Sequence, residues 1–306
     1  MQTTLISAVQ FQGKGLHSGQ HVKMTVRPAG VDHGIRFRRS DLGPGGADIR
    51  ADVTSVQPSR LCTQIGTVSG GSVRTVEHAL AALAACGIAN ARIDVTGPEL
   101  PILDGSAKPF VTSFLAAGII GQDAPVSVIK ILKPIVFGTA DSWARLEPAD
   151  QAEMQYRIAF KDAAIGDQSL AISMSGQRVI QHLCDSRTFC RQADVPAMLA
   201  NGLARGGSVY NAVVVDGARV VTPGGLRHPD EPVRHKMLDA VGDLALAGAP
   251  ILGRYVGHRA GHATTIGLVR AMFERPDAFC YLCSTPEIAR VLPGLCRPSG
   301  EFSAVA

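Results

Sequence analysis

The chain has 306 residues, of which 46% are hydrophobic and 5% aromatic, and its formal net charge is +4. This length suits two domains of about 120 and 180 residues, with enough apolar content for two cores. The low aromatic content and the lack of a basic run exclude a nucleic-acid platform. Because no apolar run approaches about 18 residues and no signal-peptide pattern opens the chain, we expect a cytoplasmic protein without a transmembrane segment.

The first strongly patterned segments are two strands and an apolar helix. Alternating apolar and polar residues predict strands over 22–27 and 91–95, and the glycine-rich stretch 43–46 predicts a loop. Residues 75–86 are mostly apolar and predict a buried helix, which Gly87 is placed to end.

Glu77 and His78 lie near the start of this predicted buried helix. Because an unpaired carboxylate is costly away from water, the pair needs a partner, and a metal ion or a catalytic cleft would provide one. A lone histidine at a helix start is also commonly a structural residue, and that alternative stays open at this point.

A turn-rich stretch at 121–125 predicts a domain boundary, which divides the chain into residues 1–123 and 124–306. Beyond it, alternation over 154–160 predicts a strand, and the stretch 222–225 predicts a loop. We therefore expect mixed helices and strands in both domains.

A second helix is predicted between Asp230 and Gly248, because the run 233–244 contains no helix breaker beyond one glycine. Asp230 is placed as its cap, Pro232 lies in its first turn, and Gly248 can close it. Because the segment is largely apolar, its polar residues indicate a specific structural or functional role.

These polar residues, His235, Asp239 and Asp243, repeat at a spacing of four and therefore share one face of the helix. A catalytic zinc ion takes three His or carboxylate ligands and leaves a fourth position for water, which the metal acidifies. His235, Asp239 and His78 would supply such a set. A simple surface pair of His235 and Asp239 remains the alternative, since nothing local shows that residues 78 and 235 meet.

The chain has seven cysteines, an odd number without the spacing of a disulfide framework. Cys280 and Cys283 form a lone Cys-x-x-Cys pattern with no second pair beside it. We expect these two residues to be buried thiols, and not a second metal site or a redox centre.

Several blocks of sequence, in a fixed order, carry a resemblance to a known family. The chain resembles the UDP-3-O-acyl-N-acetylglucosamine deacetylases, zinc amidases of lipid A biosynthesis in Gram-negative bacteria. The resemblance implies an α+β fold of two similar domains, each a β-sheet layered with a helix pair, with the zinc site at the domain interface. The blocks are GKGLHSG at 13–19, LCT at 61–63, the long stretch 75–111, SRTF at 186–189, GLARGGS at 202–208, VRHKMLDAVGDLALAG at 233–248, and Gly261-His262.

The resemblance implies a role for each polar residue already singled out, and for three more. It implies one Zn²⁺ ion held by His78, His235 and Asp239, with Glu77 as the general base that takes a proton from water. The remaining catalytic residues implied are Thr188 as an oxyanion donor, His262 as the acid that protonates the leaving amine, Asp243 as the carboxylate that orients this histidine, and Lys236 as a contact to substrate phosphate.

The resemblance also implies the substrate, a UDP-linked, acylated amino sugar. A strand-helix-strand insert over about 188–216 is expected to form an apolar passage for the 3-O-acyl chain. The oligomeric state is open, with a monomer as the expectation. The predicted substrate contacts are Leu16, Phe160, Phe189, Met198, Gly207, Ser208 and Arg259.

Some positions depart from the family pattern, mostly where the nucleotide is expected to bind. A carboxylate such as Glu147 or Asp162 would weaken contacts to an anionic nucleotide. The departures are Glu147, Asp162, Cys190, Arg191, Tyr210 and Thr264-Thr265.

The predicted function is hydrolysis of the N-acetyl group of UDP-3-O-acyl-N-acetylglucosamine. One alternative is a divergent deacetylase that acts on another N-acetylated sugar or sugar nucleotide. Another is a catalytically retired relative that only binds a sugar nucleotide. The presence of Glu77, Thr188 and His262 argues against the last, because binding alone needs no base, oxyanion donor and acid together.

Overall fold

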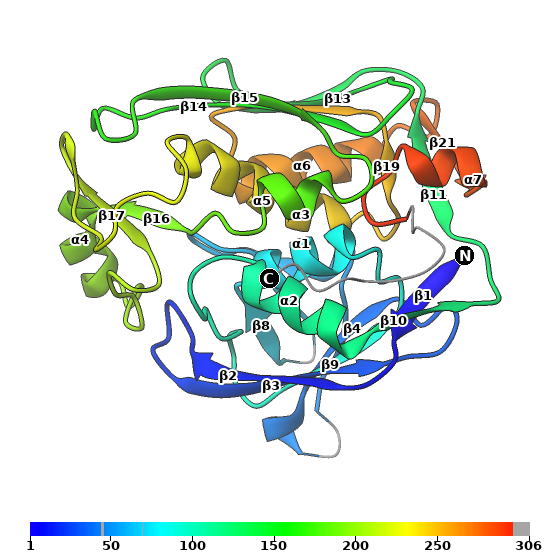
Figure 1. Cartoon of the computed structure of the whole chain (residues 1–306), viewed down its shortest axis with the longest axis horizontal. Coiled ribbons are helices and arrows are strands. Elements are labelled where there is room, and N and C mark those ends of the chain that lie inside the picture. The colour runs from blue at the N-terminus through cyan, green and yellow to red at the C-terminus, as the bar shows by residue number, and fades with distance from the viewer. Residues whose placement is uncertain (44–45, 69, 296–306) are drawn as a thin grey trace.

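Two β-sheets enclose a layer of helices in this protein (Figure 1). The structure is a computed structural model that describes residues 1–43, 46–68 and 70–295. Part of the predicted loop at 43–46 therefore lies outside the described residues. Within these residues, no helix combines the length and apolar content needed to cross a membrane.

The sheet of the N-terminal half has five strands in the order β2-β3-β9-β4-β5. Successive pairs are antiparallel except β9 with β4, which is parallel. In β3, Val22, Met24 and Val26 are buried and alternate with more exposed residues, so one face covers the core. The strands are β2 (Val9–Lys14), β3 (His21–Pro28), β9 (Ala91–Val95), β4 (Ile35–Arg39) and β5 (Asp48–Arg50).

The sheet of the C-terminal half repeats this arrangement, in the order β12-β13-β20-β14-β15. Again every pair is antiparallel except one, β20 with β14. The expectation of two similar α+β units is thus confirmed. The strands are β12 (Ile135–Gly138), β13 (Trp143–Glu147), β20 (Arg254–His258), β14 (Glu153–Ala159) and β15 (Asp167–Ser173).

The predicted division at 123/124 falls between β10 (Ile119–Gln122) and β11 (Ser127–Ile131). β10 pairs back with the first strand, β1 (Gln2–Leu5), whereas β11 pairs with β19 (Ile251–Leu252) and β21 (Phe279–Cys283). The exact domain limits remain a prediction.

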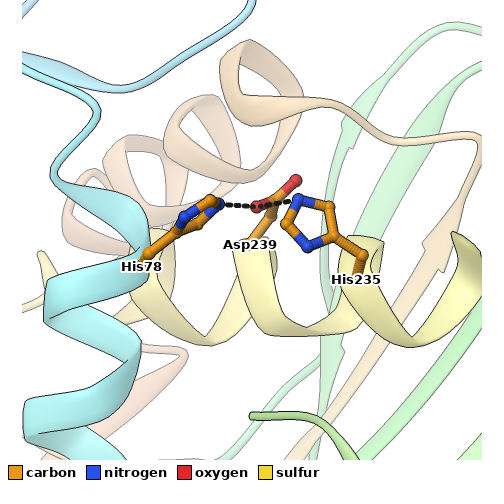
Figure 2. A group of neighbouring side chains, drawn as sticks. All are labelled: His78, His235 and Asp239. Carbon is orange, nitrogen blue, oxygen red and sulfur yellow. Dashed lines mark ion pairs between the residues drawn. The ribbon is translucent and has the colours of Figure 1, made fainter. Parts of the chain in front are cut away.

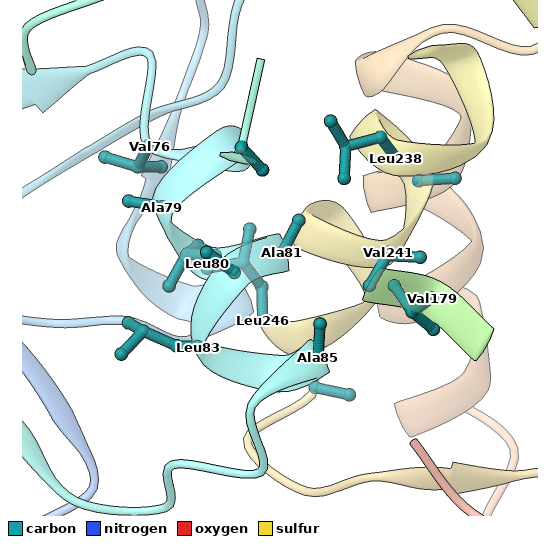
Figure 3. Packing of buried hydrophobic residues seen from close by; sticks show 14 of the residues in the cluster. Val76, Ala79, Leu80, Ala81, Leu83, Ala85, Val179, Leu238, Val241 and Leu246 are labelled. Atoms are coloured by element: carbon teal, nitrogen blue, oxygen red, sulfur yellow. The ribbon is translucent and has the colours of Figure 1, made fainter. Parts of the chain in front are cut away.

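Helices α1 (Glu77–Ala85) and α5 (Glu231–Ala245) pack together between the two sheets. Figure 3 shows the apolar side of α1, including Ala81 and Ala85, facing Leu238 and Val241 of α5. The helices approach most closely at Gly242, where an added Cβ would lie 2.0 Å from the Glu77 carbonyl oxygen. Small residues at this crossing let the backbones meet, and they bring the start of α1 against the middle of α5.

Each half contributes one further helix to the middle layer, α2 (Lys108–Ala117) from the first and α6 (His262–Phe273) from the second. Two shorter helices, α3 (Arg178–His182) and α7 (Pro286–Arg290), belong to the second half. The helix pairs supply the layered architecture that the resemblance implied.

The ends of the two central helices differ in detail from the predictions. α1 begins at Glu77, two residues later than expected, because Thr75 has a φ of 56°, which no helix accommodates. Asp230 lies at the N-cap position of α5 but makes no capping hydrogen bond; its carboxylate instead pairs with Arg234 at 2.6 Å. Gly87, with a φ of 64°, ends α1 as expected.

The insert after Arg187 has the predicted strand-helix-strand form and projects to one side of the molecule (Figure 1). β16 (Phe189–Arg191) and β17 (Val213–Asp216) are parallel, with α4 (Val195–Ala200) between them in sequence, and β18 (Arg219–Val220) pairs with β17. A corresponding small sheet in the first half consists of β6 (Val56–Gln57), β7 (Gln64–Gly66) and β8 (Ser72–Arg74).

The prediction that Cys280 and Cys283 are buried is wrong. Both lie on β21, which is an edge strand of the β19-β11-β21 sheet. Cys280 is half-buried and Cys283 is exposed, and both are free thiols. An apolar strand sequence does not distinguish an edge position, with one open side, from a central one.

Candidate metal and catalytic site

Two histidines and an aspartate converge where α1 crosses α5 (Figure 2). His78 comes from the start of α1, whereas His235 and Asp239 lie one turn apart on α5. Asp239 Oδ1 lies 3.5 Å from His78 Nε2 and 3.3 Å from His235 Nε2. All three side chains are buried. The structure thus brings together the residues predicted to bind one metal ion.

The hydrogen bond at the far side of His235 fixes the state of its ring. His235 Nδ1 lies 3.1 Å from the Ser186 carbonyl oxygen. A carbonyl only accepts, so Nδ1 carries the proton and Nε2 presents a lone pair toward Asp239 and His78. Burial lowers the pKa of His235 to about 4, although Asp239 opposes the shift, so the ring is neutral at neutral pH. A neutral ring, a second histidine and a carboxylate are a donor set that fits Zn²⁺.

The second oxygen of Asp239 is held by Lys236, whose Nζ lies 2.7 Å from Oδ2. Burial by itself would raise the pKa of Asp239, but His235 and Lys236 outweigh it and hold the pKa well below its ordinary value. Asp239 is therefore ionised, with Oδ1 directed to the two histidines. Lys236 thus contacts Asp239, and its role in binding substrate phosphate remains a prediction.

Glu77 and His262 lie close to each other beside the metal ligands. His262 Nε2 lies 3.8 Å from Glu77 Oε1 and 3.8 Å from Asp239 Oδ2. Glu77 is buried, and burial raises its pKa, while His262 and His78 oppose the shift. A carboxylate with a raised pKa is better matched to proton transfer near neutral pH than an exposed one.

His262 is held from behind by Asp243. Its Nδ1 lies 2.8 Å from Asp243 Oδ2, so this nitrogen donates and Nε2 is the nitrogen that faces the site. Burial alone would lower the pKa of His262, but the charge and hydrogen bond of Asp243, with Glu77 and Asp239, raise it to about 9. The ring is thus cationic at neutral pH and can give up a proton.

Thr188 lies in the segment of chain that connects the metal site with the insert. Its N–H donates to the Gly105 carbonyl at 2.8 Å, and its own carbonyl accepts from Val213 at 2.7 Å. Ser186, two residues earlier, carries the carbonyl that bonds His235. The segment is therefore tied to the metal ligands, and the oxyanion role of the Thr188 hydroxyl remains a prediction.

Two of the predicted substrate contacts form an aromatic pair next to His235, and a third contacts the insert. The rings of Phe160 and Phe189 meet edge to face with centroids 5.5 Å apart, and Phe189 is 6.3 Å from the ring of His235. Leu16 reaches the insert, because its carbonyl accepts from Gly206 at 2.9 Å and a Cβ at Gly207 would lie 3.6 Å from its Cδ1.

Three other predicted contacts lie farther along the chain. Met198 is half-buried on α4, and Ser208 is exposed and bonds Asn211 through its N–H. Arg259 donates its N–H to the Arg157 carbonyl at 2.8 Å. In the part of the chain that the structure describes, no hydrogen bond, ion pair or ring contact joins these three side chains to the metal ligands, and their substrate roles remain predictions.

Two of the departures from the family pattern pair with each other. Arg191 Nε of β16 lies 2.5 Å from Asp162 Oδ2, and Asp162 Oδ1 accepts from Gly217 at 3.2 Å. The pair therefore ties the insert to the turn between β14 and β15. Cys190 is half-buried beside it, and burial raises its pKa.

The other departures either have partners close by in the fold or are exposed. Glu147 pairs with Arg145 at 2.7 Å and lies opposite Arg254, at the end of β20 remote from His262. Thr265 is buried and its hydroxyl lies 2.9 Å from that of Tyr255. Tyr210 is 79% exposed. Among the described residues, the ion-pair partners of Glu147 are thus arginines of β13 and β20 and not groups of the metal site.

Two buried polar residues at the site were not predicted. Thr63 bonds both Glu77 and Asp243. Glu99 accepts the backbone N–H groups of His17 and Ser18 at 2.8 and 2.7 Å, so it fixes the loop that carries Leu16. Neither residue belongs to a periodic pattern that would have predicted its role. The sequence offers only that Thr63 and Glu99 lie within the family blocks 61–63 and 75–111.

Two histidines and an aspartate whose ligand atoms lie within 4.8 Å of one another, next to a buried glutamate and a cationic histidine, define a metal-dependent hydrolase site. A family model described as UDP-3-O-acyl N-acetylglycosamine deacetylase matches residues 2–274 of the chain. The chain belongs to this family, and it is a hydrolytic N-deacetylase.

Relatives from several bacteria agree with this assignment. A protein of Phenylobacterium zucineum is 45% identical over 278 residues, which cover 91% of this chain and 95% of the relative. One from Acidithiobacillus ferrooxidans is 44% identical over 282 residues, covering 91% of each. One from Neisseria meningitidis is 40% identical over 282 residues, covering 91% and 92%. All three bear the name UDP-3-O-acyl-N-acetylglucosamine deacetylase.

Proposed function

We propose that this protein hydrolyses the N-acetyl group of UDP-3-O-acyl-N-acetylglucosamine to the free amine and acetate, in lipid A biosynthesis, with one Zn²⁺ held by His78, His235 and Asp239. The observation that carries the proposal is that a buried glutamate and a cationic histidine meet beside this donor set, with 3.8 Å between Glu77 Oε1 and His262 Nε2 and 3.8 Å between His262 Nε2 and Asp239 Oδ2. Family membership supports the overall reaction.

When bound, the zinc ion would acidify a water molecule and polarise the acetamide carbonyl. Glu77 acts as the general base. Its Oε2 is engaged by the Thr63 N–H at 3.0 Å, which leaves Oε1 free to take the proton of the attacking water. The raised pKa of Glu77, caused by burial, makes the carboxylate basic enough for this transfer.

His262 acts as the general acid for the leaving amine. Its Nε2 is the nitrogen that faces the site, and its proton is retained at neutral pH because Asp243 helps to raise the pKa to about 9. Asp243 is buried and accepts hydrogen bonds from the Thr63 hydroxyl and from His262 Nδ1, so it holds the ring in place.

Two further residues keep the roles that the resemblance implied. Thr188 would donate a hydrogen bond to the carbonyl oxygen as it gains negative charge, and Lys236 would contact the substrate phosphate. The apolar rings of Phe160 and Phe189, with Leu16 and the insert, would receive the acyl chain.

We also propose that the enzyme works as a monomer, since one chain supplies every metal ligand. We propose further that it acts in the cytoplasm, where nucleotide-activated sugars are made.

The test compares turnover of UDP-3-O-acyl-N-acetylglucosamine with that of UDP-N-acetylglucosamine by the zinc-loaded protein. A strong preference for the acylated substrate is expected. Comparable or reversed rates would support a divergent deacetylase for another N-acetylated sugar. No acetate from either substrate, with zinc bound, would leave a relative that binds but does not catalyse.

A further inference from the structure

Thr63 is a buried residue, 1% exposed, that contacts both proton-transfer groups of the site. It lies in the loop before β7 of the N-terminal half. Its backbone N–H donates to Glu77 Oε2 at 3.0 Å, and its side-chain hydroxyl lies 2.6 Å from Asp243 Oδ1 and 3.2 Å from His262 Nδ1. Thr63, a residue of the first half, thus bonds the proposed base Glu77 of its own half. It also bonds Asp243 and His262 of the second half, which together form the acid pair.

The directions of these bonds follow from the chemistry of the groups. The Asp243 carboxylate only accepts, so the single hydroxyl proton of Thr63 goes to Oδ1. The hydroxyl can therefore only accept from His262 Nδ1, whose main acceptor is Asp243 Oδ2 at 2.8 Å. Both oxygens of Asp243 are then occupied, each by a different donor, and the carboxylate cannot rotate without breaking one of the bonds.

From this geometry we propose that Thr63 is a positioning residue: its hydroxyl locks the Asp243 carboxylate and so holds His262 with Nδ1 protonated and Nε2 directed at the reacting groups. The inference rests on the proposed function. The hydroxyl acts through Asp243 and His262 and needs no contact with substrate.

The backbone of Thr63 is held independently of its side chain. Besides donating to Glu77, it accepts the Val76 N–H at 3.3 Å, so the start of α1 fixes it on both sides. Replacing threonine by valine keeps the shape and these backbone bonds but removes the hydroxyl. Replacing it by serine keeps the hydroxyl and removes a methyl group. The pair of variants therefore separates the hydrogen bond from packing.

The experiment measures acetate release and zinc content for the parent, Thr63→Val and Thr63→Ser. We expect Thr63→Val to bind zinc as the parent does, to keep KM within about twofold and to lose on the order of 10- to 100-fold in kcat, the size expected when a catalytic group is misplaced. Thr63→Ser should recover most of the parental kcat. Thr4→Val is the matched control, because Thr4 is also buried and its hydroxyl bonds Asn90 at 2.8 Å on the unrelated strand β1.

A second readout does not depend on substrate. Proton and nitrogen NMR of the zinc-loaded protein with ¹⁵N-labelled histidine should show a protected His262 Nδ1–H in the parent and in Thr63→Ser, and its loss or faster exchange in Thr63→Val. A Thr63→Val variant with parental kcat and a parental Nδ1–H signal would overturn the proposal, as would equal losses in both variants. An inactive parent that shows the predicted NMR difference would instead refute the proposed function and leave the positioning role intact.

Discussion

The two halves of the molecule share one sheet pattern but contribute different chemistry. Both sheets have the same order of strand pairings, with a single parallel pair at the same place. Helix α1 of the first half is apolar apart from its start, where Glu77 and His78 lie, whereas α5 of the second half carries His235, Asp239 and Asp243 along one face. The first half thus supplies the base and one ligand, and the second supplies two ligands and both members of the acid pair, His262 and Asp243.

This difference shows how a duplicated arrangement can form a site that neither half contains. Local spacing on α5 organises a partial metal site, since residues four apart share a face. The site is completed only because small residues let α1 approach α5 closely enough for His78 to reach Asp239. Catalysis is therefore expected to depend on the contact between the halves as much as on the groups themselves.

The largest effect is expected from removing the base of the first half. Glu77→Gln should lower kcat by about 10²- to 10⁴-fold, the usual contribution of general base catalysis, because an amide cannot take the proton. Zinc content should be unchanged, since Glu77 is no ligand and the glutamine oxygen can still accept the Thr63 N–H. Steady-state kinetics and metal analysis measure both. Glu153→Gln, which changes a surface partner of Arg254, is the control; a Glu77→Gln variant with parental kcat would remove Glu77 as the base.

The next effect tests whether the ligand from the first half is needed to hold the metal. His78→Ala leaves only two ligands, both on α5, so zinc affinity should fall by more than about 100-fold, beyond what loss of an outer-shell partner costs. Calorimetric titration of the metal-free variant measures the affinity. His33→Ala, in the turn before β4, should bind zinc as the parent does. A His78→Ala variant that still binds one zinc tightly would refute the ligand set.

A smaller effect is expected from pushing the halves apart without touching any functional group. Gly242→Ala places a methyl group 2.0 Å from the Glu77 carbonyl, so α1 must shift. Overpacking of this kind should lower the free energy of unfolding by about 1–3 kcal/mol and reduce kcat by moving the base. Urea denaturation and kinetics measure both. Gly30→Ala, where a Cβ meets nothing within 4 Å, should change neither; equal stability of the Gly242→Ala variant would argue against the close crossing.

The smallest effect concerns the ion pair between the insert and the second sheet. Asp162→Asn should lower the free energy of unfolding by about 1 kcal/mol or less, because the Arg191 side chain is partly exposed. If the pair fixes the insert for substrate, KM for the acylated substrate should rise while the rate on UDP-N-acetylglucosamine stays the same. Asp216→Asn, which breaks an exposed pair with Arg219, is the control. Parallel changes for both substrates would show that the pair does not act on acyl binding.

Local patterns predicted those parts of the site that depend on neighbours in sequence. The stripe on α5 and the burial of Glu77 followed from helical spacing and from the apolar composition of 75–86, and both are confirmed. The meeting of His78 with His235 did not follow from spacing, since it depends on how two helices far apart in sequence cross. It was expected only from the family resemblance.

Residues defined by tertiary contacts could not be predicted from patterns. Thr63 belongs to an irregular loop, and its role arises from bonds to α1 and α5. Asp230 has the sequence signature of a cap, but the nearby Arg234 guanidinium competes for its carboxylate. Cys283 lies in an apolar strand that becomes a sheet edge. In each case the deciding partner is specified by the fold and not by the adjacent residues.

The most direct test of this account is acetate release from UDP-3-O-acyl-N-acetylglucosamine as zinc is added back to metal-free protein. We predict that the metal-free protein is inactive and that the rate rises in proportion to added zinc up to about one equivalent per chain. Full activity without metal would contradict the account, as would a rate that does not respond to zinc.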